Sequence, residues 1–115
     1  TDAPARGESS MRTDISINFG RADVKDLPNL IAKSLPDQGA IEVQRDVPGK
    51  EHFWHRHDTD ETLVILDGRL RFYWEQGEQV CAPGDVISLP AGTHHGSEAL
   101  DCGATYLIAF HPVRL

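Results

Sequence analysis

Two histidines and a glutamate in the middle of the chain have the types and spacing of metal ligands. His55 and His57 stand two residues apart, and residues two apart in a β-strand point to the same face. The polar run 58–60 is typical of a turn, and the apolar, β-branched run 62–66 predicts a second strand that Glu61 opens. Two imidazoles and a carboxylate from neighbouring strands could therefore reach one cation.

A further imidazole follows the turn-forming run 90–92, at His94 or His95. Adjacent strand residues face opposite ways, so only one of the two can point at the site, and the spacing from the turn favours His95. The predicted metal ligands are His55, His57, Glu61 and His95. This set suits one divalent transition ion per chain, whether Fe, Mn, Ni, Co, Cu or Zn. Four ligands on an octahedral ion leave two open positions, as a catalytic metal requires.

Composition limits the class of protein. The chain has 115 residues, 39% of them hydrophobic, which predicts one domain with a single core. Its net charge of −7 and its lack of a basic run argue against a nucleic-acid or membrane partner. No apolar run nears the roughly 20 residues that span a bilayer, and no signal-peptide pattern opens the chain, so we expect a cytoplasmic protein. Cys81 and Cys102 are expected to be buried thiols.

The chain divides into three segments with different expected structures, and these contain the elements that must position the ligands. Residues 1–12 read as a flexible tail, residues 13–39 as an edge strand around Ile15 and Ile17 followed by a short helix, and residues 40–115 as a β-barrel. The helix has Asp26 or Leu27 at its cap and Pro28 in its first turn. Its predicted apolar face is Leu27, Leu30, Ile31 and Leu35.

From residue 40 onward the apolar period changes to 2, and turn formers recur at short intervals. Strands are expected at 41–47, 51–57, 61–66, 70–74, 79–81, 86–89, 95–99 and 105–110. Asp67-Gly68 is a strong signal for a two-residue hairpin. Many short strands with regular Gly and Pro breaks predict an all-β, antiparallel sandwich or barrel.

The ligand residues lie in two motifs that resemble those of the cupin family of small jelly-roll barrels (double-stranded β-helices). The first motif runs Gly49, His55, His57, Glu61, Gly68, and the second runs Gly84, Pro90, Gly92, His95, with Ala99 where the family has Asn. The resemblance covers about residues 40–110. It implies a single-domain cupin barrel with a bound metal, and such barrels are commonly homodimers.

Alternation along the strands predicts a pocket. If His55 and His57 point inward, Glu51 and Phe53 should do so too, and His52 should face the opposite side. The pocket candidates are Phe53, Leu63, Phe72, Tyr106 and Phe110. Trp54 and Tyr73 should point outward, where exposed aromatic side chains often mark a subunit interface.

Two functions are compatible with these features. The first is a metal-dependent enzyme on a small organic substrate, either a dioxygenase or a metal-assisted isomerase, lyase or cyclase, and this reading is favoured. The alternative is a non-catalytic module that binds or senses a small ligand or a metal. No second base is evident in the expected pocket. The sequence names neither the metal nor the substrate.

Overall fold

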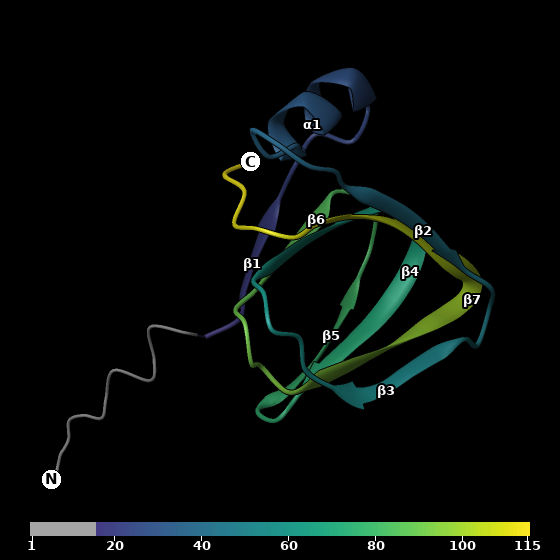
Figure 1. Ribbon diagram of the computed structural model, residues 1–115. Helices are drawn as coiled ribbons and strands as arrows, with labels where there is room; N and C mark the ends of the chain where they lie inside the picture. Colours follow the sequence, from purple (N-terminus) through teal and green to yellow (C-terminus); the bar gives the residue numbers. More distant parts are fainter. Residues whose placement is uncertain (1–15) are drawn as a thin grey trace, which may run out of the picture.

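A computed structural model describes residues 16–115, which form one helix and seven strands (Figure 1). In chain order the elements are β1 Asn18–Arg21, α1 Leu27–Ser34, β2 Glu42–Asp46, β3 Glu51–His55, β4 Glu61–Trp74, β5 Gly77–Cys81, β6 Asp85–Leu89 and β7 His95–Ala109. The predicted tail over residues 1–12 lies outside the described residues.

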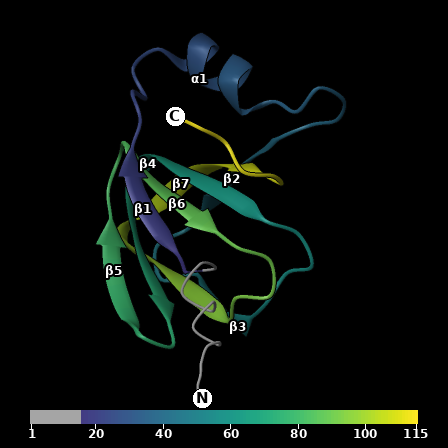
Figure 2. The same ribbon diagram turned by 90° about the vertical axis from the view of Figure 1, so that its left-hand side faces the viewer.

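The strands form one antiparallel sheet built around β4 and β7. The hydrogen-bonded order is β1-β6-β4-β7-β2, with β3 also paired to β7 and β5 to β4. Because β4 and β7 each pair with several shorter strands along their length, the sheet curls on itself (Figures 1 and 2). The predicted all-β jelly-roll barrel with one short helix is confirmed.

Two predicted turns prove to be bends inside long strands. β4 runs through Asp67-Gly68, with register shifts against β7 on both sides. Gly68 and Gly103 both have φ of 75°, and a Cβ on Gly68 would lie 2.0 Å from the Gly103 carbonyl oxygen. The glycines let the two strands bend together and stay paired. The predicted hairpin is therefore wrong, and a similar bend joins the expected strands 95–99 and 105–110 into β7.

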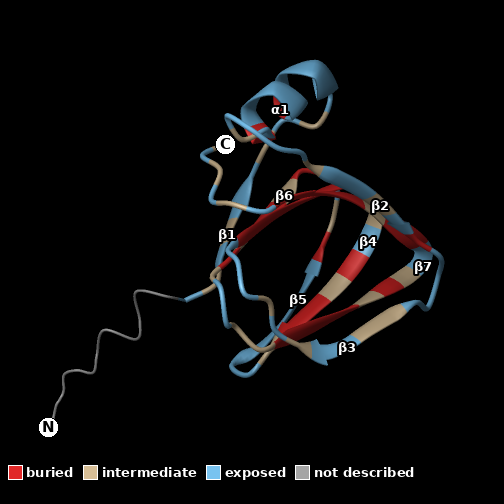
Figure 3. Cartoon of the chain, in the orientation of Figure 1, coloured by how far each residue is buried: buried red, intermediate tan, exposed pale blue. Residues whose placement is uncertain are grey.

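The core lies on both faces of β4. Leu63 and Ile65 belong to the cluster inside the barrel, whereas Val64 belongs to a second cluster on the outer face. The outer cluster is covered by Leu30 of α1. A strand that is covered on both faces is typically a continuous apolar run, which explains why residues 63–66 are all apolar. Figure 3 shows this burial along β4, β6 and β7.

Helix α1 begins where the sequence predicts. The Asp26 carboxylate accepts a hydrogen bond from the Asn29 backbone N–H at 3.2 Å, which caps the first turn. The predicted apolar face is wrong, because only Leu30 is buried and the other three members, Leu27, Ile31 and Leu35, are 40–42% exposed. A helix of two turns that lies against a curved sheet covers only a narrow strip of it.

The N-terminal edge strand lies further along the chain than predicted. Ile15 is outside the described residues, and β1 starts at Asn18 and pairs with β6 of the same chain. Ile17 and Phe19 pack against the interior cluster. The apolar alternation in this segment therefore continues past the predicted strand, and β1 completes the sheet within one chain.

The two cysteines differ in their surroundings. Cys81 is buried in the interior cluster, and burial raises the pKa of its thiol to about 11. Cys102 is exposed, beside the bend in β7, so the expectation of burial is wrong for this residue. Among residues 16–115, no helix has the length and apolar character needed to cross a membrane.

Candidate metal centre

Three imidazoles meet at one end of the barrel. One ring nitrogen from each of His55, His57 and His95 lies within 4.8 Å of the other two. His55 ends β3 and is paired with His95, which opens β7, while His57 follows in the loop to β4. The Gly92 backbone N–H donates to the His57 carbonyl oxygen at 2.8 Å. This bond joins the loop that carries His57 to the loop that precedes His95.

The hydrogen bonds of these rings leave nitrogen lone pairs free to bind a cation. Nδ1 of His55 lies 2.5 Å from the Phe53 carbonyl oxygen, and Nδ1 of His95 lies 2.8 Å from the Thr93 carbonyl oxygen. A carbonyl oxygen only accepts, so Nδ1 carries the proton in both rings and Nε2 carries the lone pair. Such backbone bonds are usual for metal-binding histidines.

The spacing of the nitrogens fits a shared ion. Nε2 of His55 lies 3.1 Å from Nε2 of His57. Two ligand nitrogens about 2.1 Å from one metal and at about 90° to each other are about 3.0 Å apart. Without an ion, an Nε2–H of His57 can donate a hydrogen bond to the Nε2 lone pair of His55. A divalent ion would take the place of that proton between the two nitrogens. The three histidines therefore fit a divalent transition metal in both donor type and spacing.

Burial favours the neutral form of His57 and His95. It lowers the pKa of His95 to about 4, outweighing the hydrogen bond to the Thr93 carbonyl, and repulsion from His55 and His57 acts in the same direction. Burial also lowers the pKa of His57, with a further contribution from His55. Because a metal binds the neutral imidazole, these rings are ready as ligands near neutral pH.

Glu61 lies beside the histidines but is not part of their cluster. Its Oε2 is 3.6 Å from Nδ1 of His57, and the side chain is only 9% exposed. Burial raises the pKa of this carboxyl, and the charge of Glu42 adds to the shift. In this position Glu61 could bind an ion held by the histidines or could accept a hydrogen bond from His57.

A pocket of about 280 Å³ opens over the three histidines. Four of the predicted pocket residues, Leu63, Phe72, Tyr106 and Phe110, line it together with Glu61. The Phe72 ring stacks on His95, with centroids 5.4 Å apart. The pocket volume is just below the range of about 300–1,000 Å³ for drug-sized ligands, which favours a small molecule.

Phe53 does not line this pocket, so the expectation for that residue is wrong. The register between β3 and β7 shifts between His52 and His55, and such a bulge reverses the alternation of faces. His52 therefore lines the pocket together with His55. Glu51 and Phe53 lie on the outer face, where Phe53 is 70% exposed. The expectations that Glu51 points inward and that His52 points away are wrong for the same reason.

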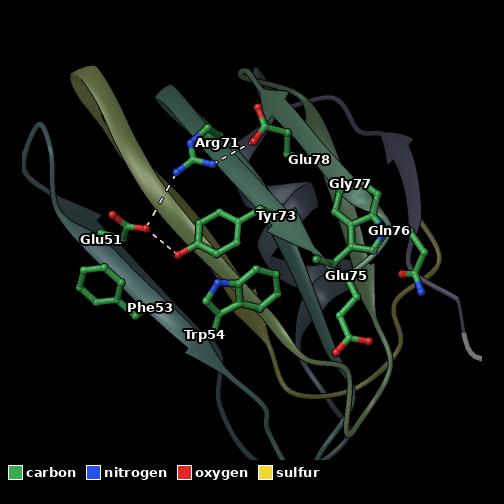
Figure 4. A pocket seen from close by; sticks show the side chains of 10 residues that line it. Glu51, Phe53, Trp54, Arg71, Tyr73, Glu75, Gln76, Gly77 and Glu78 are labelled. Atoms are coloured by element: carbon green, nitrogen blue, oxygen red, sulfur yellow. Dashed lines mark hydrogen bonds and ion pairs between the residues drawn. The ribbon is translucent and has the colours of Figure 1, made fainter.

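The outer face of β3 and β4 carries an aromatic hollow of about 660 Å³ (Figure 4). Trp54 lies with its ring centroid 4.9 Å from those of both Tyr73 and His94. The Tyr73 hydroxyl donates to Glu51 at 2.6 Å. Trp54 and Tyr73 thus lie on the outer side as predicted, but only Trp54 is exposed, because Tyr73 is 6% exposed. His94 also lies on this side, 3.4 Å from Glu75.

Sequence reasoning missed the polar side chains that β2 contributes. Glu42 and Gln44 line the pocket, and Asp46 is buried beside it. The apolar residues of the same segment, Val43 and Val47, are 60% and 67% exposed. The strand therefore turns its polar face inward, against the usual pattern. The alternation of Glu42, Gln44 and Asp46 was the available signal, but periodicity alone does not say which face is buried.

Comparisons with known proteins agree with this geometry. Residues 42–108 match the family model described as "Cupin domain". The chain is 32% identical over 105 residues to an acireductone dioxygenase of Parvibaculum lavamentivorans, covering 82% of this chain but only 55% of that enzyme.

Two solved structures are also similar. One is a cupin-2 domain protein of Shewanella frigidimarina, with 26% identity and a TM-score of 0.53 over 59% of this chain and 65% of that one. The other is the DMSP lyase DddQ of Ruegeria pomeroyi, with 27% identity and a TM-score of 0.57 over 60% of this chain and 36% of that one. With a family match over more than half of its length, a barrel of the expected form and three converging histidines, this chain belongs to the cupin family.

Proposed function

We propose that this cupin is a metal-dependent enzyme of the dioxygenase type that acts on a small organic substrate. The observation that carries the proposal is the meeting of three histidine nitrogens within 4.8 Å in the lining of one pocket. The similarity to an acireductone dioxygenase supports oxygen chemistry, although the chain spans 55% of the length of that relative.

In this proposal His55, His57 and His95 hold one divalent ion, and Glu61 supplies the fourth ligand. The ion would be Fe, Mn, Ni, Co, Cu or Zn, because this donor set accepts all of them. When bound, such an ion polarises substrate oxygens and, if it is redox-active, allows reaction with dioxygen. The apolar side chains of the pocket, Leu63, Leu70, Phe72, Ile108 and Phe110, would limit the size of the substrate and exclude water.

Oxygen uptake tests the proposed reaction. Protein loaded with Fe²⁺ is mixed with an acireductone and then with a panel of diketones, thiols, phenols and sugar acids in an oxygen electrode. We expect substrate-dependent uptake that falls at least about 100-fold in His57→Ala, because that change removes a ligand. Turnover of a substrate without oxygen uptake would instead support the isomerase or lyase reading.

A matched variant controls for damage to the fold. His94→Ala removes a histidine from the outer face and should leave oxygen uptake unchanged. A folded, metal-loaded protein that turns over none of these compounds would contradict the proposal and favour a binding or sensing module.

We also propose that the chain forms a homodimer through the aromatic hollow on β3 and β4. Phe53 and Trp54 are 70% and 47% exposed there, beside the charged side chains of Glu51 and Arg71. An exposed aromatic centre with a polar rim is the usual anatomy of a protein interface.

Light scattering on a sizing column measures the proposed dimer directly. The wild type should have twice the 12.7 kDa mass of one chain, and Phe53→Glu should shift the protein to a monomer, because it buries a charge in the interface. Val80→Glu is the matched control, since Val80 is an exposed apolar residue on β5 outside the hollow. A wild-type monomer, or a dimer that Phe53→Glu leaves intact, would rule out this interface.

The cytoplasmic location of the protein stays a prediction.

A further inference from the structure

A second polar cluster lies in the same pocket, on strands β2, β3 and β7. Its centre is Asp46, which is 5% exposed. The Asp46 carboxylate accepts from the Tyr106 hydroxyl at 2.7 Å and from the Gln44 amide at 3.2 Å, and it lies 3.0 Å from Nε2 of His52. We define these four residues, Gln44, Asp46, His52 and Tyr106, as the Asp46 cluster.

The hydrogen bonds of the Asp46 cluster fix the orientation of His52. The Gln44 amide nitrogen, which only donates, contacts both Asp46 and the Tyr106 hydroxyl. The Gln44 amide nitrogen also lies 3.3 Å from Nε2 of His52. If Nε2 of His52 carries a proton and donates it to Asp46, the Gln44 amide cannot donate to that nitrogen as well. A carboxylate accepts from His52 whether the ring is neutral or charged, so Nε2 carries a proton in both forms. In the neutral ring the lone pair is therefore on Nδ1.

The charges in the cluster support this arrangement. Burial alone would raise the pKa of Asp46, but hydrogen bonds from Tyr106, His52 and Gln44 outweigh it, so the pKa is lowered. Burial, followed by the hydrogen bond to Asp46, raises the pKa of Tyr106. Near neutral pH the cluster therefore holds a carboxylate, and the phenol stays a hydrogen-bond donor. A carboxylate that orients an imidazole in this way is the arrangement of a general base.

The position of the cluster connects it with the metal pocket. Gln44, His52 and Tyr106 line the same pocket as His55, His57 and His95. His52 is three residues before His55 on β3, and it faces the pocket only because of the bulge between them. The inverted pattern of β2 places Asp46 and Gln44 on the same side. The bulge in β3 and the inward-facing polar side of β2 both depart from regular strand patterns, and both contribute to the Asp46 cluster. Such departures are most often found at functional sites.

We propose that His52, oriented by Asp46, is the proton acceptor for a small α-hydroxy ketone or enediol bound in this pocket. This inference rests on the proposed function and names the substrate class. Nδ1 of His52 takes a proton from the carbon next to the carbonyl of a hydroxy ketone, or from an enol O–H group of an enediol. In both cases the electron pair of the broken bond stays on the substrate as an enolate, and Asp46 balances the charge of the imidazolium. The proton later passes to the product or to water, so no oxidant or reductant is consumed.

The chemistry of the pocket selects this substrate class. An imidazole is a moderate base, and it removes only hydrogens that a neighbouring carbonyl or enol makes acidic. The pocket volume of about 280 Å³ excludes large substrates. Its lining pairs three polar side chains of the Asp46 cluster with apolar side chains. The polar ones are Gln44, His52 and Tyr106, and the apolar ones include Leu63, Phe72 and Phe110. A small molecule with one oxygenated end and one apolar end fits both halves.

Hydrogen exchange tests the proposal without any oxygen chemistry. The protein is loaded with Zn²⁺, which has no redox chemistry, and is incubated with hydroxyacetone in D₂O. Loss of the carbon-bound proton signals is followed by NMR. We expect the wild type to catalyse this exchange and His52→Gln to slow it at least about 100-fold, because general-base catalysis contributes about 10²–10⁴-fold. His52→Gln should keep its metal and its melting temperature, since the glutamine can still donate to Asp46.

Asp46→Asn tests the positioning role of the carboxylate. An asparagine amide can donate to Nε2 of His52, which moves the ring proton to Nδ1 and removes the base from the pocket side. We expect exchange to fall at least about 100-fold, as in triads where Asn replaces the orienting Asp. NMR of the metal-free protein provides a readout that is independent of activity. His52 should carry its proton on Nε2 in the wild type and on Nδ1 in Asp46→Asn.

Several results would overturn the proposal. One is the absence of exchange by the zinc-loaded wild type, and another is exchange at the wild-type rate in either His52→Gln or Asp46→Asn. A wild-type His52 protonated on Nδ1 alone would also overturn it. His94→Ala, on the outer face, should exchange like the wild type. Because oxygen takes no part in this assay, its failure is distinguishable from a failure of the proposed dioxygenase reaction.

Discussion

Replacing His95 with alanine is expected to abolish stoichiometric metal binding. His95 is 4% exposed, and its Nδ1 is bonded to the Thr93 carbonyl, so that Nε2 is available to an ion. Loss of a residue that hydrogen-bonds to a metal ligand lowers the metal affinity about 10–100-fold. Loss of a ligand itself should lower the affinity further. Elemental analysis after dialysis, together with a competition titration using a metal indicator, measures the change.

The neighbouring histidine provides the matched control. His94 precedes His95 in the chain, but it lies on the outer face against Trp54 and Glu75. His94→Ala should therefore bind metal like the wild type. Because the alanine at position 95 leaves a cavity, the melting temperatures of the metal-free proteins are compared, and His95→Gln is included as a better-filling variant. Full metal content in both His95 variants would contradict the proposed ligand set.

Glu61 can be placed by the same measurement. If it is the fourth ligand, Glu61→Ala and Glu61→Gln should both weaken binding strongly. If it only accepts a hydrogen bond from His57, at the 3.6 Å position seen here, Glu61→Gln should bind nearly as well as the wild type, because an amide oxygen can still accept.

Gly68→Ala is expected to cause the largest loss of stability among single methyl additions to this barrel. Gly68 has φ of 75°, a conformation that costs a residue with a Cβ about 1–2 kcal/mol. The new Cβ would also lie 2.0 Å from the Gly103 carbonyl oxygen, which is backbone and cannot rotate away. Together these effects should reduce the free energy of unfolding by about 3–5 kcal/mol. For a domain of this size that lowers the melting temperature by about 10–20 °C.

Gly49→Ala separates the two effects. Gly49 has φ of 83°, but a Cβ there would meet nothing within 4 Å. Gly49→Ala should therefore reduce the free energy of unfolding only by the cost of the backbone conformation, about 1–2 kcal/mol. Thermal unfolding followed by circular dichroism compares the two variants with the wild type. Equal losses of stability in the two variants would mean that the close approach of β4 and β7 at Gly68 does not contribute to the effect of Gly68→Ala.

The sequence predicted the fold class and the histidines because both depend on local patterns. Alternating apolar residues with regular Gly and Pro breaks predict an antiparallel sandwich or barrel, and the resemblance to the cupin motifs implies the barrel. The spacing within those motifs singles out His55, His57 and His95, together with Glu61. The positions of Leu63, Phe72 and Tyr106 around the pocket also followed from alternation along β4 and β7, and Phe110, directly after the end of β7, continues the same alternation.

The failures arise where distant parts of the chain decide the local conformation. Asp67-Gly68 has the sequence of a hairpin, but its pairing with the bend at Gly103 keeps β4 continuous. The bulge before His55 depends on the register against β7, and one extra residue exchanges His52 for Phe53 at the pocket.

By itself, the amino-acid sequence of this protein determined an antiparallel all-β fold and the residue types at the candidate metal site, and the resemblance of its two motifs to the cupin family implied the barrel. Periodicity and spacing are properties of neighbouring residues, and the sequence contains them completely. Only the tertiary structure decided which face of β2 and β3 points inward, and so brought His52 into the pocket and Asp46 beside it. A strand has two faces that local pattern cannot tell apart, and the choice between them depends on the strands that pair with it.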